Sequence, residues 1–179
     1  AYAQTQDRQR YMAQLAEMRT DESIYGLLQR FTYRTEGAIA DSEEKQYGYE
    51  LLLQLGAPAI APIKRFVSSH EAVYWPLKAL GELAGREVAV ELLLEALDSA
   101  SGKGGRVNEH KVQLVSNLRD FSHPRVQAKL LELCADPLED VRIMAIDGLM
   151  TYGEEAACAA AVARIADPDE SPRVKTVVV

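Results

Sequence analysis

The sequence predicts an all-α protein built as a right-handed stack of helix pairs, that is, an α-solenoid. The first reason is an apolar row that recurs at a fixed interval: Val112, Val115, Leu118 and Phe121, then Ile143, Ile146, Leu149 and Tyr152. The second reason is the spacing of three within each row, which places these side chains on one face of a helix. A repeat of about 30 residues with helical spacing is typical of solenoids made of helix pairs.

The repeat extends in both directions along the chain. Towards the C-terminus, Asp136-Pro137 and Arg142 return at the same interval as Asp167-Pro168 and Arg173. Towards the N-terminus, the apolar row returns as Tyr74, Leu77, Leu80 and Leu83, and again as Gln46, Tyr49, Leu52 and Leu55. The interval from the row at 74 to the row at 112 is longer than the others, because the segment SASGKGGRV at 99–107 is inserted there. An insertion in one repeat is expected to form a loop at one edge of the stack.

Residues 42–179 are therefore predicted to be the repeat array, with an incomplete last repeat, and residues 1–41 a divergent helix pair that caps it. In this cap we expect helices at 3–19 and 22–34, the second capped by Thr20-Asp21. Asp41 and Glu44 have the spacing of a capping box, and we expect them to open the helix that ends at Gly56.

Proline and glycine mark the ends of the remaining helices. Because Pro76 lies inside an apolar pattern, its helix either kinks there or begins near Trp75. Gly85 and Gly153 each follow a periodic segment and are predicted to end helices. The expected helices of the array after Gly56 are about 58–67, 70–84, 87–97, 108–121, 124–135, 138–152, 154–166 and 171–179.

Composition limits the classes of function. The net charge of −7 disfavours a nucleic-acid binder, and only residues 101–135 are locally basic, with 6 basic against 3 acidic side chains. No apolar run approaches the ~20 residues of a membrane span. No signal-like segment opens the chain, but it begins with Ala1 instead of Met, so removal of an upstream signal segment stays an alternative. Cys134 and Cys158 lie on apolar helical faces, so we expect both to be reduced and buried, which indicates a cytoplasmic protein.

Four segments carry a resemblance to a known family. They are ALGELAG at 79–85, AVELLLEALD at 89–98, LLLQLGAPAIAPIKRF at 51–66 and DPLEDVRIMAIDGL at 136–149. Together they resemble the HEAT-like repeats of phycobilisome-lyase-type proteins, whose usual Val-Arg at the start of the outer helix matches Val141-Arg142. The resemblance covers residues 42–179 and implies the architecture. Because this repeat serves scaffolds, lyases, hydroxylases and DNA-repair proteins, it does not select an activity.

Two enzymatic alternatives follow from the resemblance. A bilin-lyase-like activity is implied by the repeat alone, since no residue marks a tetrapyrrole site. A metal-hydroxylase-like activity is suggested by His70-Glu71, because HEAT-type deoxyhypusine hydroxylases contribute several His-Glu pairs to a di-iron centre. Here Glu109-His110 is reversed and His123 precedes Pro124, so no second pair exists. We therefore predict no catalytic residue, no metal ligand and no cofactor.

Two nucleotide-related alternatives meet similar objections. The segment Gly102–Gly105 invites comparison with a phosphate-binding loop, but no strand precedes it and no Ser or Thr follows Lys103. A DNA-repair function, which HEAT-like alkylpurine glycosylases suggest, needs a basic face for the duplex. The acidic segments on both sides of residues 101–135 would repel phosphate.

The sequence therefore favours a non-enzymatic protein-interaction module or scaffold that uses a solenoid surface. We expect the basic segment to meet another protein with an acidic surface, because local charge reversal and the inserted loop coincide in one repeat. Trp75 is a second candidate contact, with core packing as the alternative role, while Tyr74 falls in the buried row. The predicted partner-binding residues are Trp75, Lys103, Arg106, Lys111, Arg119, Arg125 and Lys129.

Overall fold

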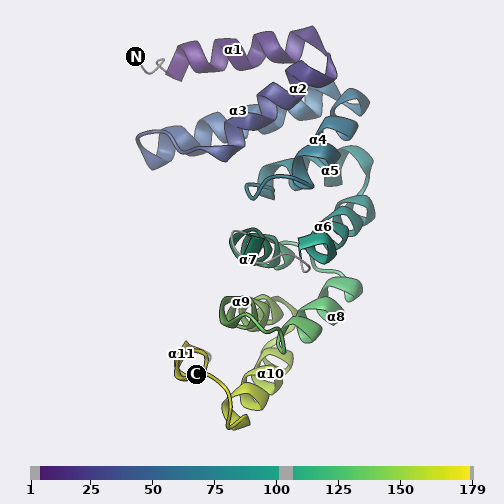
Figure 1. The fold of residues 1–179 in the computed structure, drawn as a ribbon. Helices are drawn as coiled ribbons and strands as arrows, with labels where there is room; N and C mark the ends of the chain where they lie inside the picture. Colours follow the sequence, from purple (N-terminus) through teal and green to yellow (C-terminus); the bar gives the residue numbers. More distant parts are fainter. Residues whose placement is uncertain (1–4, 101–106, 178–179) are drawn as a thin grey trace. The chain divides into compact units, whose positions relative to one another are not determined.

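The computed structural model describes residues 5–100 and 107–177, and within these ranges it contains helices and no strand (Figure 1). The all-α prediction is therefore confirmed. The chain divides into two compact units, Ala1–Leu92 and Leu93–Val179, and the boundary falls within helix α6 (Arg86–Ala100). The segment Gly102–Gly105 lies outside the described residues.

The first unit begins with α1 (Thr5–Met18), α2 (Asp21–Leu28) and a 3₁₀ turn, η1 (Gln29–Thr32). It continues with α3 (Ala38–Leu55), the 3₁₀ turn η2 (Ala57–Ala59), α4 (Ile60–Val67) and α5 (Tyr74–Ala84). Helix α1 packs against α2 and α3, α2 against α4, and α5 against both α3 and α4. The core consists of fully buried side chains from these helices, among them Ile24, Leu28, Leu52, Ile63, Phe66 and Leu77.

The second unit is centred on α9 (Glu139–Leu149). This helix packs against α7 (Val107–Leu118), α8 (Pro124–Leu133), α10 (Glu154–Ala166) and α11 (Pro172–Val177), and it is followed by the 3₁₀ turn η3 (Met150–Tyr152). The repeated apolar row supplies much of the core, since Val115, Leu118, Ile143, Ile146 and Leu149 are all buried.

Several predicted helix ends are confirmed. Gly56, Gly85 and Gly153 adopt positive φ angles of 70°, 97° and 115°, a conformation that glycine reaches without a Cβ clash. Thr20 caps α2, because its hydroxyl accepts from the Ser23 N–H at 3.1 Å. Helix α5 begins at Tyr74, so Pro76 lies in its first turn, where a missing N–H breaks no helical hydrogen bond.

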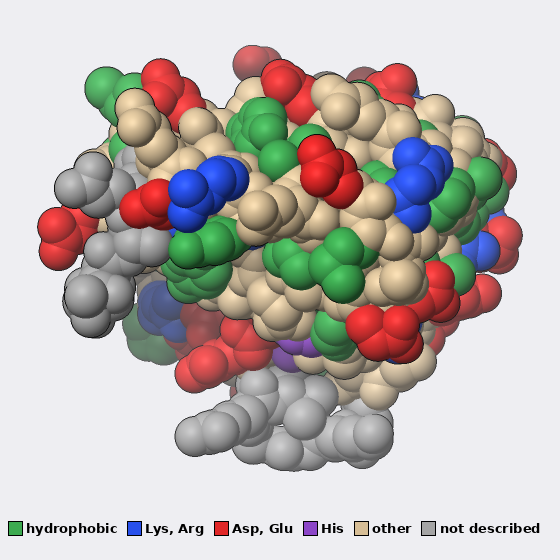
Figure 2. Space-filling model, turned by 90° about the horizontal axis from the view of Figure 1, so that it is seen from above, with side chains coloured by type: hydrophobic (Ala, Val, Ile, Leu, Met, Phe, Trp, Pro, Cys, Tyr) green, Lys and Arg blue, Asp and Glu red, His purple; other side chains and the backbone are tan. Residues whose placement is uncertain are grey.

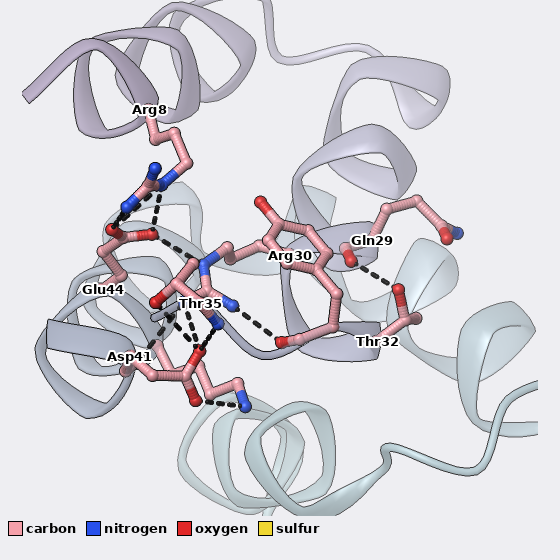
Figure 3. Close-up of polar contacts among 9 residues, drawn as sticks. Arg8, Gln29, Arg30, Thr32, Thr35, Asp41 and Glu44 are labelled. Atoms are coloured by element: carbon pink, nitrogen blue, oxygen red, sulfur yellow. Dashed lines mark hydrogen bonds and ion pairs between the residues drawn. The ribbon is translucent and has the colours of Figure 1, made fainter. Parts of the chain in front are cut away.

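The capping box predicted at Asp41 and Glu44 is wrong. Helix α3 begins earlier, at Ala38, after Gly37 with a φ of 88°. Both carboxylates therefore lie inside the helix, where they bind cations from other elements instead of the N–H groups at the helix end (Figure 3).

These two carboxylates form an ion network that joins α1, η1 and α3. Glu44 is fully buried and accepts from the Arg8 guanidinium on one side and from Arg30 Nε, at 3.0 Å, on the other (Figure 3). The Arg30 guanidinium also donates to Asp41 Oδ1 at 2.8 Å, and Lys45 Nζ lies 2.8 Å from Asp41 Oδ2. Hydrogen bonds from these cations hold the pKa of both Asp41 and Glu44 below the usual carboxyl range, although burial acts in the opposite direction. The network therefore fixes the beginning of α3.

Ion pairs also connect successive repeats in the second unit. Lys111 in α7 binds Asp136, which lies in the turn before α9. Arg142 in α9 binds Glu170, which lies in the turn before α11. Because Arg142 follows Lys111 by the interval of the repeat, the two cations occupy the same position in successive repeats. Each cation thus holds its helix to the turn that opens the next pair.

The hydroxyl of Tyr152 makes a second connection between repeats. It donates to the carbonyl oxygen of Phe121 at 2.7 Å and accepts from the His123 N–H at 3.0 Å, with the His123 carbonyl also at 3.0 Å. Tyr152 and Phe121 are the last members of two successive apolar rows and hold equivalent positions. The later repeat therefore satisfies backbone groups in the turn of the earlier one.

The two cysteines differ in their surroundings. Cys134 is buried, as predicted, and its thiol donates to the carbonyl of Leu130 at 3.2 Å. Cys158 is exposed, so the prediction that it is buried is wrong. It lies on the outer face of α10 with Ala159 and Val162, which are also exposed. Apolar helical spacing alone does not show whether a neighbouring helix covers that face.

None of the described helices is both long and apolar enough to cross a lipid bilayer.

Candidate functional site

The best candidate for a binding site is a group of aromatic side chains on α3 and α5, which we call the aromatic surface. It consists of Tyr49 from α3 and of Tyr74, Trp75 and Lys78 from α5. The packing of α3 against α5 brings the two helices together, so that the Tyr49 and Trp75 ring centroids lie 5.7 Å apart at a tilt of 54°. Tyr74 meets Trp75 edge-on at 5.3 Å. Such inclined arrangements are the favoured geometry of aromatic pairs.

Lys78 places its ammonium group over two of these rings. Its Nζ lies 4.9 Å from the centroid of Tyr49 and 5.1 Å from that of Trp75, both within cation–π range. Lys78 follows Trp75 by three residues, so one helical turn brings the two side chains onto the same face. Each contact of this kind contributes about 0.5–1 kcal/mol at an exposed site.

Two carboxylates influence the aromatic surface electrostatically. Burial raises the pKa of Tyr49 above its usual value, and the negative charges of Glu82 and Glu50 raise it further. Glu82 and Lys78 are exposed and four residues apart on α5, while Glu50 is exposed on α3. The aromatic surface therefore combines one cation with two nearby carboxylates.

The exposure of Tyr74 differs from the prediction, whereas that of Trp75 lies between the two roles considered for it. The repeat places Tyr74 in the buried row, but its side chain is 43% exposed. Tyr74 is the first residue of α5, whereas Leu77 and Leu80, one and two turns later in the same row, are fully buried. Trp75 is half-buried, so it both packs against Tyr49 and keeps part of its indole accessible.

The sequence interpretation misses two members of the aromatic surface. The repeat assigns Tyr49 to the core row, and the structure indeed leaves it only 8% exposed. Lys78 has no predicted role, although its distance of three residues from Trp75 on a predicted helix is a usable signal. The contact between Tyr49 and Trp75 is harder to predict from the sequence, because it depends on how α3 packs on α5.

Each of three residues in the predicted basic segment either lies outside the described residues or has a buried side chain. Lys103 and Arg106 lie outside the described residues. The Lys111 side chain is 9% exposed, and its ammonium binds the carboxylate of Asp136. Lys111 thus joins α7 to the turn before α9 and is not positioned to meet a partner.

The other three cations of the segment reach the surface of the second unit. Arg119 Nη1 lies 3.2 Å from Asp147 Oδ2, and the partly buried Lys129 places its Nζ 2.9 Å from Asp98 Oδ1. Arg125 is exposed on α8, four residues before Lys129 and thus on the same helical face. Three of the six cations counted in the sequence, Lys111, Arg119 and Lys129, are therefore paired with carboxylates from other parts of the chain.

His70 is held by an aromatic cluster. Its ring stacks on Phe66 with centroids 4.0 Å apart, and it meets Tyr25 edge-on at 5.9 Å. Its Nδ1 lies 2.9 Å from Ser69 Oγ, and its Nε2 lies 3.3 Å from Gln29 Nε2. Within residues 5–100 and 107–177, no three His, Cys, Asp or Glu side chains are grouped so that they could hold a metal ion.

Exposed apolar side chains also lie on other helices, among them Val162 and Ile165 on α10. Tyr11 and Met18 on α1 are 51% and 63% exposed, and the Arg10 guanidinium lies 5.2 Å from the Tyr11 ring. On the face seen in Figure 2, hydrophobic side chains are interspersed with acidic and basic ones. Exposed apolar atoms are normal on a protein surface, whereas the aromatic surface gathers three rings and a cation.

Comparison with known proteins finds a similarity in the second unit. The family model described as HEAT repeats matches residues 108–179. The comparison with curated proteins gave no match, and neither did the comparison with solved structures. The matched segment covers α8, α9, α10, α11 and most of α7, the same elements that carry the ion pairs between repeats. The match supports a HEAT-like repeat protein, without confirming the phycobilisome-lyase-type subfamily.

Proposed function

We propose that this protein is a non-enzymatic interaction module that docks another protein on the aromatic surface. The observation that carries the proposal is the half-buried indole of Trp75, held between Tyr49 and the exposed ring of Tyr74. HEAT-like repeats commonly serve as protein-interaction scaffolds, because stacked helices present an extended surface.

The physical argument concerns the cost of ordering side chains. Tryptophan and tyrosine dominate the energy of many interfaces because they bury a large area and have few rotatable bonds. On the aromatic surface, the ring contacts with Tyr49 and Tyr74 already hold Trp75 in one arrangement. A partner that covers Tyr74 and Trp75 would therefore gain buried area with little loss of side-chain freedom.

A quantitative capture experiment tests this proposal. The full chain is immobilised as wild type, as Tyr74→Ala, as Trp75→Phe and as the control Tyr11→Ala, and captured proteins are quantified by mass spectrometry. Tyr11 is a matched control, because it is a similarly exposed tyrosine with a cation near its ring. We expect a set of proteins retained by the wild type and by Tyr11→Ala but lost with Tyr74→Ala and reduced with Trp75→Phe. Equal retention by all four forms would contradict docking on this surface.

Three finer predictions belong to the same proposal. They are the right-handed stacking of the helix pairs, the capping role of the first two helices, and the phycobilisome-lyase-type origin of the repeats. The bilin-lyase, hydroxylase and DNA-repair alternatives have no support beyond the repeat itself.

The basic segment stays a predicted second contact, directed at an acidic partner surface. What favours it is the pair of cations on one face of α8, the exposed Arg125 and the partly buried Lys129. Replacing Lys103, Arg106, Arg125 and Lys129 together with Glu is expected to abolish capture of such a partner. Unchanged capture would remove this segment from consideration.

A further inference from the structure

We infer that the aromatic surface accepts a cationic side chain of the partner, an arginine or a lysine, at the position that Lys78 occupies in the free protein. This inference rests on the proposed function, because it assigns the chemistry of the partner that docks there. It differs from the predicted acidic partner, which concerned the basic segment of the second unit.

The first argument is that the chain's own cation already lies in this position. The ammonium of Lys78 sits about equally far from two ring centroids, 4.9 Å from Tyr49 and 5.1 Å from Trp75. The faces of these rings carry the negative part of the aromatic quadrupole, which attracts cations. The two rings therefore form a site that selects positive charge.

The second argument is that Lys78 is weakly held there. No described residue forms an ion pair with Lys78, and its side chain is exposed. Within the described part of the chain, its ammonium interacts with the two rings, at the end of a long and flexible aliphatic stem. A guanidinium group is planar and less strongly hydrated than an ammonium, so an incoming arginine would stack on the same rings more favourably.

The third argument is the sign of the surrounding charge. Glu82 and Glu50 act electrostatically on Tyr49, the ring that Lys78 covers, and both carboxylates are exposed. The unit as a whole is also acidic, because Ala1–Leu92 contains 10 basic and 13 acidic side chains. Once Lys78 moves aside, a partner cation would meet two ring faces together with net negative charge. An acidic partner would meet the repulsion of both carboxylates.

Trp75 supplies a direct readout, because it is the single tryptophan in the chain. Its fluorescence is followed while the full chain is titrated with an acetylated, amidated peptide of alternating arginine and glycine. The matched probe is the same peptide with glutamate in place of arginine. We expect a saturable change in fluorescence with the arginine peptide and none with the glutamate peptide.

Three variants test the individual steps. Lys78→Met removes the competing cation and should tighten binding of the arginine peptide roughly two- to fivefold, the equivalent of one surface cation–π contact. Glu82→Gln keeps the side-chain shape and should weaken binding to a similar degree. Glu43→Gln, a matched change at an exposed glutamate in an earlier turn of α3, should leave binding unchanged.

The possible failures separate the inference from the proposed function. A saturable response to the glutamate peptide would show that Lys78 itself contacts an acidic partner and would overturn the inference. Weaker arginine-peptide binding by Lys78→Met would also overturn it, because it would show that Lys78 does not compete with the peptide cation. No response to either peptide, combined with partner capture that still depends on Tyr74, would likewise overturn the inference and leave the docking surface intact. Capture that is indifferent to Tyr74→Ala would contradict the proposed function instead.

Discussion

The guanidinium of Arg142 in α9 binds the carboxylate of Glu170, a residue that follows it by 28 positions. Arg142 Nη1 also donates to the carbonyl oxygen of Asp136 at 2.7 Å. One side chain therefore joins the turn before α9 to the turn before α11. The hydrogen bonds from Arg142 hold the pKa of the Glu170 carboxyl below its usual range, despite the burial of this side chain.

A double-mutant cycle should show strong coupling between Arg142 and Glu170. We expect each alanine variant to lower the free energy of unfolding by about 3 kcal/mol, because it removes the closest partner of a largely buried charge; Arg164, at 3.8 Å from Glu170, is a weaker substitute for Arg142. The coupling energy should be about 1–3 kcal/mol, measured by urea denaturation. The control cycle uses Arg119 and Asp147, whose side chains are 55% and 53% exposed, and should give less than about 1 kcal/mol. Equal coupling in the two cycles would contradict this account.

Glu44→Gln should destabilise the first unit strongly. The substitution keeps the size of the side chain but removes the buried carboxylate that Arg8 and Arg30 share, so that the buried guanidinium of Arg30 keeps one carboxylate, Asp41, instead of two. We expect a loss of about 3 kcal/mol in the free energy of unfolding, measured by urea denaturation. Glu43→Gln is the matched control at the neighbouring exposed position, and its effect should stay within about 0.5 kcal/mol. Similar losses for both variants would show that the ion network contributes little.

Stability should decrease in acid because the paired carboxylates resist protonation in the folded state. The folded-state pKa values of Asp41, Glu44 and Glu170 are lowered. For a lowered pKa, the stabilisation is complete above the unfolded-state value of about 4 and is lost as the pH falls towards the folded-state value. Urea midpoints should therefore hardly change from pH 7 to about pH 5 and should fall steeply below about pH 4. In the variant Glu44→Gln this fall should be shallower, and an unchanged slope would exclude Glu44 as a source of it.

Two helical glycines should respond oppositely to alanine. A Cβ at Gly148 in α9 would lie 2.9 Å from Leu130 Cδ2, and Leu130 is fully buried. We expect Gly148→Ala to be destabilising by about 1–2 kcal/mol, since overpacking outweighs the gain in helix propensity. At Gly81 in α5 the nearest atom would be Ala89 Cβ at 3.9 Å, so Gly81→Ala should be stabilising by about 0.5–1 kcal/mol. Thermal unfolding of both variants measures the difference, and a stabilising Gly148→Ala would contradict the close packing of α8 on α9.

The two thiols should differ in reactivity. Burial raises the pKa of the Cys134 thiol to about 11, and thiolate is the form that reacts. A water-soluble disulfide reagent should therefore modify Cys158 in the folded protein and Cys134 only after unfolding. Peptide mass spectrometry after short labelling distinguishes the two sites. Equal labelling of both under native conditions would show that Cys134 is accessible.

The sequence predicts the features of this fold that depend on local spacing. The apolar rows and the glycines at 56, 85 and 153 locate the helices, because helical periodicity and positive φ angles act within a few residues. The sequence misleads at Asp41 and Glu44, since a capping box and a helix-internal ion pair share the same spacing. Their true partners, Arg8 and Arg30, come from other elements of the first unit.

The candidate site shows the same limit. Periodicity identifies the helical face of Tyr74 but not whether a neighbouring helix covers it. The count of positive charges in the basic segment omits the carboxylates that neutralise them, among them Asp136, which lies beyond the segment and binds Lys111. Among the predicted contact residues, Trp75 is the one that the sequence singles out by local features alone. It is a large aromatic side chain beside Pro76 at a helix start, and packing and binding are the two roles expected there.

The hydroxyl of Tyr152 constrains the distance and orientation between two successive helix pairs. It reaches the backbone at Phe121 and His123 only if α9 presents it at one angle, and inserting or deleting a single residue in α9 would rotate it by about 100°. A change of length within α9 would therefore break these hydrogen bonds, whereas the preceding interval contains the additional segment 99–107. We therefore expect changes of length to be tolerated in the connecting loops and not within α9.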